Sequence, residues 1–262
     1  MEIKSYKKLF GSPLIFSSIK KNKQYFTDYL KQLGFVQFSD NPKQLWTNIY
    51  EQVFDNSRYE YIYKNEILKL FYADIMRKNK ILLSEVELYS DNTIHNILDL
   101  LLISNGNMHA IEIKSDFDTF QRLDNQLPMY CELFQYVSVF VSDYKVKQVE
   151  HYIDNIGFDN VGIISLADYK VETIREPKSN EERINKNLIL DNLKIRHPQL
   201  CNDTLSVEEL YSYWAVILRE DYKLDNKFVD AMPDALKFYA FSHNYLPPLK
   251  RQRLISHFTR HK

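Results

Sequence analysis

The stretch of sequence that decides the fold is ILDLLLISNGNMHAIEIK, residues 97–114. Two runs of apolar and β-branched residues flank Asn105-Gly106, a dipeptide favoured in two-residue type I′ turns because both central positions need a positive φ angle. The stretch therefore predicts an antiparallel β-hairpin. A two-residue turn also sets the register, because Ser104 must then face Asn107 and the facing pairs follow in step along both strands.

This register brings charged residues together at the open end of the hairpin. Asp99 is expected directly opposite Glu112, with Lys114 two residues further along on the same face of the sheet. Like charges at facing strand positions destabilise the pair, and a divalent cation or a proton between the two carboxylates removes the conflict. The competing interpretation is a solvated strand face, on which acids and lysines often alternate.

The neighbouring side chains favour the metal site over the solvated face. Apolar residues are expected on the same face as the charged group, namely Leu101, Ile103, Met108 and Ala110. The residues expected on the opposite face are Leu98, Leu100, Ile111 and Ile113. The charged end of the hairpin therefore lies beside buried surface, where ionisable groups with specific partners are candidate functional residues.

The rest of the chain divides into zones by the spacing of its apolar residues. Helical spacing extends from residue 17 to about residue 78, and it returns between the later strands and beyond about residue 175. Runs typical of strands lie at residues 81–88, 97–104, 109–115, 136–142 and 161–166. The predicted order is helix, three strands, helix, strand, helix, strand, which is an α/β fold with an antiparallel hairpin and a later crossover.

Three segments follow from these zones. They are a helical N-terminal extension (1–57), a core (58–175) and a helical C-terminal region with a basic tail (176–262). The first helix is expected to begin at a Ser17 or Ser18 cap and to end at Gly34. Two patterns that resemble capping boxes, Ser179-x-x-Glu182 and Ser206-x-x-Glu209, predict the starts of later helices.

The composition excludes several classes of protein. Only 5 of the 262 residues are glycine, and the chain has no glycine-rich phosphate loop or dinucleotide fingerprint. A net charge of -1 does not by itself recruit nucleic acid. Cys131 and Cys201 lie in no metal-ligand spacing, which is typical of a reducing compartment. No window approaches the roughly 20 apolar residues needed to cross a bilayer, so we expect a cytoplasmic protein without a membrane partner.

The order of elements and the Asp…Glu-x-Lys hairpin resemble the PD-(D/E)XK, or restriction-endonuclease-like, nuclease superfamily. Residues 112–130 are similar to a small bacterial and phage family of that superfamily, whose signature is EIKSDxDTxxRLxxQxxxY. The matching residues are EIKSD at 112–116, Asp118, Thr119, Arg122, Leu123, Gln126 and Tyr130. The resemblance implies a restriction-endonuclease-like core of α-β-β-β-α-β order, with helical additions at both ends.

The resemblance also implies roles for the residues at the hairpin. Asp99 and Glu112 would ligate Mg²⁺, for which Mn²⁺ would substitute, and the main-chain carbonyl of Ile113 would add a third ligand. Lys114 would position or deprotonate the attacking water. Gln126 would support these residues or contact a phosphate of the substrate.

Further residues are candidates for the same site. Arg122 is expected to contact phosphate or to form an ion pair with Asp118. An additional metal-ligating acid is expected from Glu66 or Glu87; Glu85 shares the face of Glu87 and is not distinguished from it by alternation. A solvated carboxylate is an equally good interpretation of each of these acids.

The basic tail is a candidate nucleic-acid surface, although charged tails are more often simply solvated. The cations expected to contact nucleic acid are Lys250, Arg251, Arg253 and Arg260. The leading hypothesis is a metal-dependent nuclease, acting on DNA rather than RNA, in bacterial or phage repair or defence. The alternative is a catalytically silent module of the same fold that binds DNA or a protein partner as a phage or defence-system effector. The sequence leaves open a homodimer or a protein partner at the helical ends.

Overall fold

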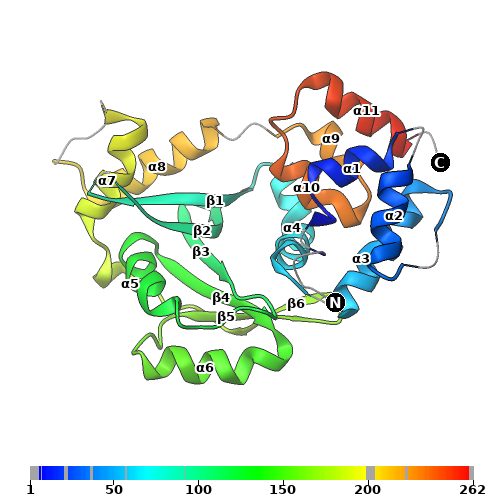
Figure 1. Cartoon of the computed structure of the whole chain (residues 1–262). Coiled ribbons are helices and arrows are strands. Elements are labelled where there is room, and N and C mark those ends of the chain that lie inside the picture. The colour runs from blue at the N-terminus through cyan, green and yellow to red at the C-terminus, as the bar shows by residue number, and fades with distance from the viewer. Residues whose placement is uncertain are drawn as a thin grey trace. The chain divides into compact units, whose positions relative to one another are not determined.

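The structure is a computed structural model, and it describes residues 6, 8–20, 23–35, 38–56, 58–91, 93–198, 204–221 and 224–259 (Figure 1). The chain forms two compact units: a helical unit of residues 1–69 and 223–262, and a sheet unit of residues 70–222. Helix α4 (Glu60–Met76) begins in the first unit and ends in the second. The helical unit contains residues from both ends of the chain, whereas the division based on the sequence places the two ends in separate segments.

The sheet unit is built on an open six-stranded sheet in the order β1-β2-β3-β4-β5-β6. Strands β3, β4 and β5 are parallel to one another, and the other neighbouring strands are antiparallel. The strands are β1 (Lys80–Ser90), β2 (Thr93–Ser104), β3 (Asn107–Ile113), β4 (Tyr136–Ser142), β5 (Gly162–Ala167) and β6 (Lys170–Arg175). The mixed α/β architecture predicted from the sequence is confirmed.

The register of the β2-β3 hairpin is also confirmed. Asn105 and Gly106 both have positive φ angles, 51° and 82°, as a type I′ turn requires. Pairing runs from Ser104–Asn107 to Leu100–Ile111 without a shift. The turn chemistry alone therefore sets the facing residues over this part of the hairpin.

Strand β6 was not predicted. The turn that leads into it is made by Asp168 and Tyr169, which both have positive φ angles (46° and 62°). A tyrosine at such a position is uncommon and carries no turn signal in the sequence. The strand itself is an edge strand with largely exposed side chains, so the alternation that identifies a half-buried strand is missing.

One expected face assignment is wrong. Leu98 packs in the same buried cluster as Leu101, although strict alternation places these two side chains on opposite faces. At this point β1 pairs Ser84 with Leu100 and Val86 with Leu98 in one register, and Glu85 and Asp99 between them are not paired. Glu85, at that point, has a positive φ angle of 54°. The side-chain alternation of β2 thus reverses next to Asp99.

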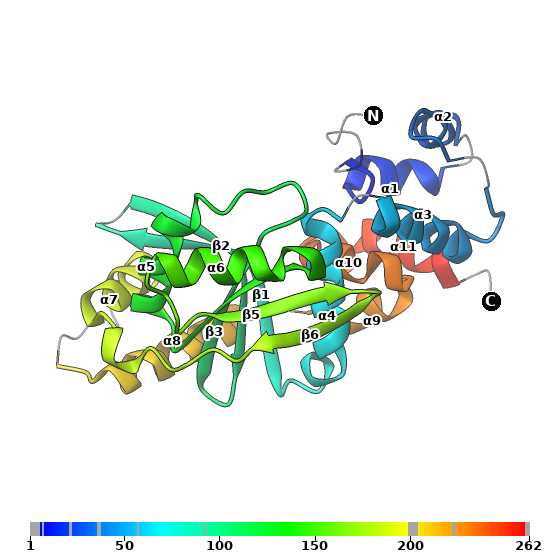
Figure 2. The same cartoon turned by 90° about the horizontal axis from the view of Figure 1, so that it is seen from below.

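Helices cover the core of the sheet unit. They are α5 (Leu123–Leu133), α6 (Val146–Asn155), α7 (Lys186–Arg196) and α8 (Val207–Asp221), with short 3₁₀ turns η2 (Asp143–Lys145) and η3 (Glu181–Arg183). Helix α6 lies beside β5 in both views (Figures 1 and 2). The rings of Phe134 and Trp214 stack with their centroids 5.7 Å apart, which fixes α8 against the end of α5.

The helical unit is held by a core rich in aromatic rings and by one buried amide. Its helices are α1 (Ser12–Ser18), α2 (Gln24–Gln32), α3 (Pro42–Asn56), the first part of α4, α9 (Asn226–Ala231), α10 (Lys237–Ser242) and α11 (Pro248–Thr259), with the 3₁₀ turn η5 (Asp234–Leu236). Trp46 and Phe26 are fully buried with ring centroids 5.6 Å apart. Asn65 donates to the carbonyl of Asp234 (3.0 Å) and accepts from the N–H of Phe238 (2.9 Å). These bonds tie the first part of the chain to the last.

Two of the predicted helix starts need correction. The single helix expected from Ser17 to Gly34 is two helices, and the hydroxyl of Ser17, at the end of α1, donates to the carbonyl of Leu14 (2.8 Å). The first predicted capping box opens only η3, and α7 is capped instead by the side chain of Asn185. At the second box, the reciprocal bonds are present at the start of α8.

Candidate functional site

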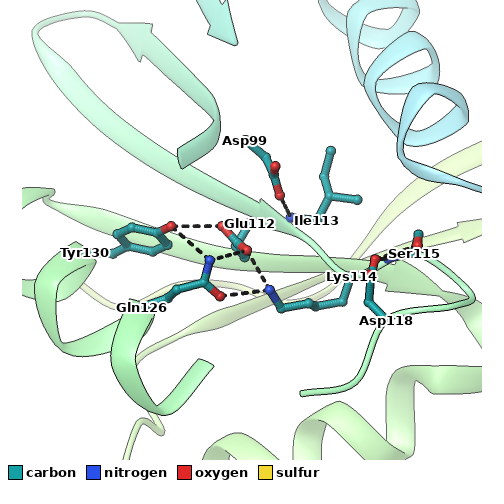
Figure 3. Close-up of polar contacts among 8 residues, drawn as sticks. All are labelled: Asp99, Glu112, Ile113, Lys114, Ser115, Asp118, Gln126 and Tyr130. Carbon is teal, nitrogen blue, oxygen red and sulfur yellow. Dashed lines mark hydrogen bonds and ion pairs between the residues drawn. The ribbon is translucent and has the colours of Figure 1, made fainter. Parts of the chain in front are cut away.

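The candidate site lies where the β2-β3 ladder ends (Figure 3). Beyond the Leu100–Ile111 pair, the main-chain N–H of Ile113 donates to Oδ2 of Asp99 at 2.7 Å. The Asp99 carboxylate therefore reaches toward the neighbouring strand. Asp99 lies between Leu98 and Leu101, where the side-chain alternation of β2 reverses.

Glu112 is the centre of a buried hydrogen-bond network. Its side chain is almost fully buried, yet both carboxylate oxygens have donors (Figure 3). Oε1 accepts from Nζ of Lys114 (2.6 Å) and from Nε2 of Gln126 (2.7 Å). Oε2 accepts from the hydroxyl of Tyr130 (3.0 Å). Glu112 on β3 and Lys114, just after its end, thus form the charged pair, and α5 supplies the two neutral partners.

The side-chain amide of Gln126 joins the acid to the lysine. Its Oε1 accepts from Lys114 (2.8 Å) while its Nε2 donates to Glu112. Gln126 and Tyr130 are four residues apart on α5 and therefore share one face of the helix. The apolar side chains of Leu123 and Leu127 are buried in the core of the sheet unit and hold that helix in place. The packing of α5 in the core thus holds Gln126 and Tyr130 in position beside Glu112.

The electrostatics of the network keep Tyr130 a hydrogen-bond donor. Burial raises the pKa of Tyr130 far above the usual value for a phenol, and the negative charges of Glu112 and Asp99 raise it further. The phenol therefore stays protonated at any physiological pH.

Glu85 is the acid on β1 that lies close to Asp99. Ligand oxygens of these two side chains are within 4.8 Å of each other. Glu87 instead accepts a hydrogen bond from the hydroxyl of Tyr89 (2.6 Å). Alternation left these two glutamates undistinguished, and the positive φ angle of Glu85 is what separates them. Residues held in uncommon backbone conformations are often found at functional sites.

The donor set is one that a hard divalent cation accepts. Mg²⁺ prefers oxygen ligands and is usually bound through one or two carboxylates. The oxygen-bearing groups at this end of the hairpin are the carboxylates of Asp99 and Glu85, whose oxygens lie within 4.8 Å of each other, together with the carboxylate of Glu112 and the main-chain carbonyl of Ile113. Oε1 of Glu112 has two donors already and Oε2 has one, and each oxygen of a carboxylate can accept about two. Oε2 is therefore the atom of Glu112 that fits a metal.

The loop after Lys114 is anchored by two side chains. The carboxylate of Asp118 accepts from the N–H of Ser115 (2.9 Å) and from its hydroxyl (2.5 Å). Lys145, at the end of η2, donates to the carbonyls of Ser115 (2.7 Å) and Asp118 (2.9 Å). Burial lowers the pKa of Lys145, although Asp116 and Asp118 oppose the shift. Lys145 was missed in the sequence because its partners are main-chain atoms about 30 residues away.

Other predicted residues lie apart from this network. Arg122 is exposed at the start of α5, and the described part of the chain shows no ion pair between it and Asp118. Glu66 belongs to the helical unit, where it is buried and accepts from Tyr50 and from Lys69, both at 2.6 Å. It lies in the interior of α4 rather than at the start of a helix. These bonds account for its burial without a metal.

The basic residues of α11 differ from one another. Arg251 forms an ion pair with Asp225, so its charge is satisfied within the helical unit. Nζ of Lys250 lies 5.8 Å from the centre of the Phe16 ring. Arg253 is exposed at a hollow in the surface, and Arg260 lies outside the described residues. The structure therefore distinguishes three cations, Lys250, Arg251 and Arg253, that the sequence treats alike.

Comparison with known proteins matches most of the chain to one family. The sequence profile described as "Bacteriophage P4 protein cII" matches residues 54–227. Protein cII of Enterobacteria phage P4 is 28% identical over 108 residues, which are 36% of this chain and 39% of that protein. The aligned part is thus well under half the length of this curated relative.

Solved structures give only low similarity. The protein of unknown function SPO1766 from Silicibacter pomeroyi has a TM-score of 0.34 and 13% identity, covering 55% of this chain and 94% of that one. SfsA from Pyrococcus furiosus, in complex with Ca²⁺, has a TM-score of 0.25 and 11% identity, covering 52% and 64%. Scores this low do not establish a shared fold. Among the described helices, none combines the length and the apolar content that crossing a lipid bilayer requires.

Proposed function

This chain belongs to the bacteriophage P4 protein cII family, and we propose that it is a metal-dependent nuclease that hydrolyses phosphodiester bonds, with DNA as the favoured substrate. The observation that carries the proposal is the buried Glu112–Lys114–Gln126 network beside the carboxylate of Asp99. The proposed core is restriction-endonuclease-like, which the order α4-β1-β2-β3-α5-β4 supports. The proposed setting is bacterial or phage DNA repair or defence in the cytoplasm.

The burial of the charged pair supports a chemical role. Removing a carboxylate and an ammonium from water costs several kcal/mol per ion, which their mutual attraction only partly offsets. Apolar residues of similar volume at Glu112 and Lys114 would often give an equally stable or more stable core. A pair kept at this cost, with a glutamine that orients both members, is therefore better explained by catalysis than by stability.

Asp99, Glu112, the Ile113 carbonyl and Glu85 are the groups that would hold Mg²⁺ or Mn²⁺. A divalent cation there would supply a Lewis acid that stabilises the negative charge developing on the phosphate. Tyr130 and Gln126 hold the Glu112 carboxylate in one orientation by donating to it. The Ile113 N–H does the same for Asp99.

Lys114 is the proposed catalytic residue that acts on the attacking water. Its ammonium is held by Glu112 and by the amide oxygen of Gln126, so two of its three protons have fixed acceptors. The third is left for a water or a phosphate oxygen. In this arrangement, the Lys114 ammonium donates to the water through its third proton and orients it for attack on the phosphorus.

A second candidate function rests on the completeness of the same network. Lys114, Gln126 and Tyr130 provide three hydrogen bonds to Glu112 from within the chain. This closed arrangement suits a catalytically silent module that binds DNA or a protein partner. Metal binding separates the alternatives, because a silent module needs no cation between Asp99 and Glu112.

The test is cleavage by the purified full chain of linear duplex, circular duplex and single-stranded DNA, with Mg²⁺ or Mn²⁺. We expect cleavage that stops on addition of a chelator and that is lost in Glu112→Gln. The matched control is Glu172→Gln, which makes the same change on the exposed face of β6 and should retain activity. Metal-independent cleavage, or equal activity of the two variants, would refute the proposed nuclease site.

A further inference from the structure

Two adjoining hollows mark the surface of the helical unit between α1, α2 and α11. Their volumes are about 900 and about 1030 Å³, and they share Phe16, Lys20 and Lys250 in their linings. Because the shared residues lie at the junction, the hollows form one continuous groove. Helices α1 and α11, which come from opposite ends of the sequence, supply most of the residues that line it.

The groove carries positive charge. Its lining includes Lys20, Lys250 and Arg253, and among the residues that the structure describes it includes no aspartate or glutamate. In the described part of the chain, none of these three cations is in an ion pair, whereas Arg251 on the same helix pairs with Asp225. Charge complementarity therefore calls for an anionic ligand.

The size of the groove and its aromatic residues narrow the class of ligand. Each hollow is as large as sites that hold drug-sized molecules, so an isolated phosphate would leave most of the space empty. The side chain of Tyr25 borders one hollow and is 62% exposed. Phe16 borders both hollows and lies beneath the ammonium of Lys250. A groove that combines cations with aromatic rings is typical of surfaces on which unpaired bases stack.

We propose that this groove binds single-stranded nucleic acid, with Lys20, Lys250 and Arg253 contacting phosphates and Tyr25 and Phe16 stacking on bases. A duplex keeps its bases stacked on one another and so offers no free base faces to these rings. An acidic peptide such as polyglutamate would pair with the cations but has no base that could stack on the rings. The role of this binding rests on the proposed nuclease function, because the bound strand would then be the substrate of cleavage or its product.

The test measures binding of a fluorescent oligothymidylate of about 20 nucleotides, longer than typical single-strand site sizes, by anisotropy at several salt concentrations. Excess EDTA is present throughout, so the failure of metal-dependent cleavage would not affect the result. We expect the full chain to bind this strand more tightly than a duplex of the same length or polyglutamate. On single strands, each phosphate contact adds about 0.7 to the slope of log affinity against log salt.

Two variants and a matched control complete the test. Lys250→Gln with Arg253→Gln should lower the salt slope by about 1.4, as expected for two lost phosphate contacts. Tyr25→Ala should weaken binding about tenfold with the slope unchanged, because stacking is not ionic. Lys31→Gln with Lys227→Gln removes the same charge from exposed positions outside the groove and should leave affinity and slope unchanged.

Several results would overturn the proposal. They are no measurable binding of the single strand, duplex or polyglutamate binding at least as tight as that of the single strand, and an equal loss of slope in the control. Thermal unfolding of each variant, followed by circular dichroism, separates these outcomes from a folding defect. If the double variant unfolds early, Lys20→Gln, at an exposed position, replaces it and should lower the slope by about 0.7.

Discussion

The Asp99 carboxylate accepts a hydrogen bond from the main-chain N–H of Ile113 at 2.7 Å, at the position where a continued ladder would pair Ile113 with Leu98. At the end of the hairpin, the Asp99 side chain thus accepts the hydrogen bond that a main-chain carbonyl would otherwise accept. The bond fixes one carboxylate oxygen beside the strand that carries Glu112. It also makes the orientation of Asp99 depend on the register that the Asn105-Gly106 turn sets.

Removing the metal-site residues should separate metal binding from cleavage. We expect Asp99→Ala and Glu112→Ala to lose both, because each removes a proposed ligand. Lys114→Ala should lose cleavage but keep metal binding, because the negative charge of Glu112 is then no longer compensated by the lysine and remains to attract the metal ion. Calorimetric titration with Mn²⁺ and a cleavage assay measure the two properties. Wild-type cleavage in Lys114→Ala would contradict the proposed role of the lysine.

Removing one member of the buried Glu112–Lys114 pair should lower the free energy of unfolding more than neutralising both members. Lys114→Met leaves the Glu112 carboxylate buried without its cation, and we expect the free energy of unfolding to fall by about 3 kcal/mol. Adding Glu112→Gln should recover most of that loss, because a neutral amide still bonds to Gln126 and Tyr130. Urea denaturation of both variants measures the difference. A double variant as unstable as the single one would show that the pair is stabilising in itself.

Lys145 should affect cleavage through the loop that it holds. Lys145→Met removes the donor to the carbonyls of Ser115 and Asp118, and we expect a stability loss of about 1–3 kcal/mol together with slower cleavage. Metal affinity should change little, because the proposed ligands are untouched. Lys147→Met, on the exposed side of α6, is the matched control. Faster amide exchange at residues 115–118 in Lys145→Met alone would identify a positioning role.

His109 should make stability depend on pH. Burial lowers the pKa of His109 to about 4, and its Nε2 lies 2.8 Å from the hydroxyl of Ser138. Because the unfolded chain binds the proton more readily than the folded one, stability should be full above about pH 6.5 and fall as the pH decreases toward 4. The loss contributed by this residue is up to about 3 kcal/mol.

Urea denaturation between pH 7 and pH 4, with His109→Gln as the comparison, tests this expectation. The variant lacks the titrating group, so its free energy of unfolding should fall less than that of the unmodified chain over this range. Equal decreases in the two proteins would mean that other groups account for the acid sensitivity.

The sequence by itself determined the parts of the protein that depend on local contacts. The Asn105-Gly106 turn predicts the pairing down to Leu100–Ile111, because positive φ angles at two adjacent residues admit only a few turn types. The period of four on α5 places Gln126 and Tyr130 on one face, and the structure shows both on Glu112. From α4 to β5, the order of helices and strands followed from apolar spacing in the same way.

Only the tertiary structure decided features that depend on contacts between distant segments or on backbone conformations without a sequence signal. No glycine or asparagine in the sequence signals the positive φ angle of Glu85. The core position of Leu98 and the closeness of Glu85, rather than Glu87, to Asp99 likewise have no sequence signal. Lys145 bonds to carbonyl oxygens, which every residue carries, so no spacing identifies it. The basic residues of α11 could not be distinguished from one another in the sequence either, because the ion pair of Arg251 with Asp225 joins residues that are distant along the chain.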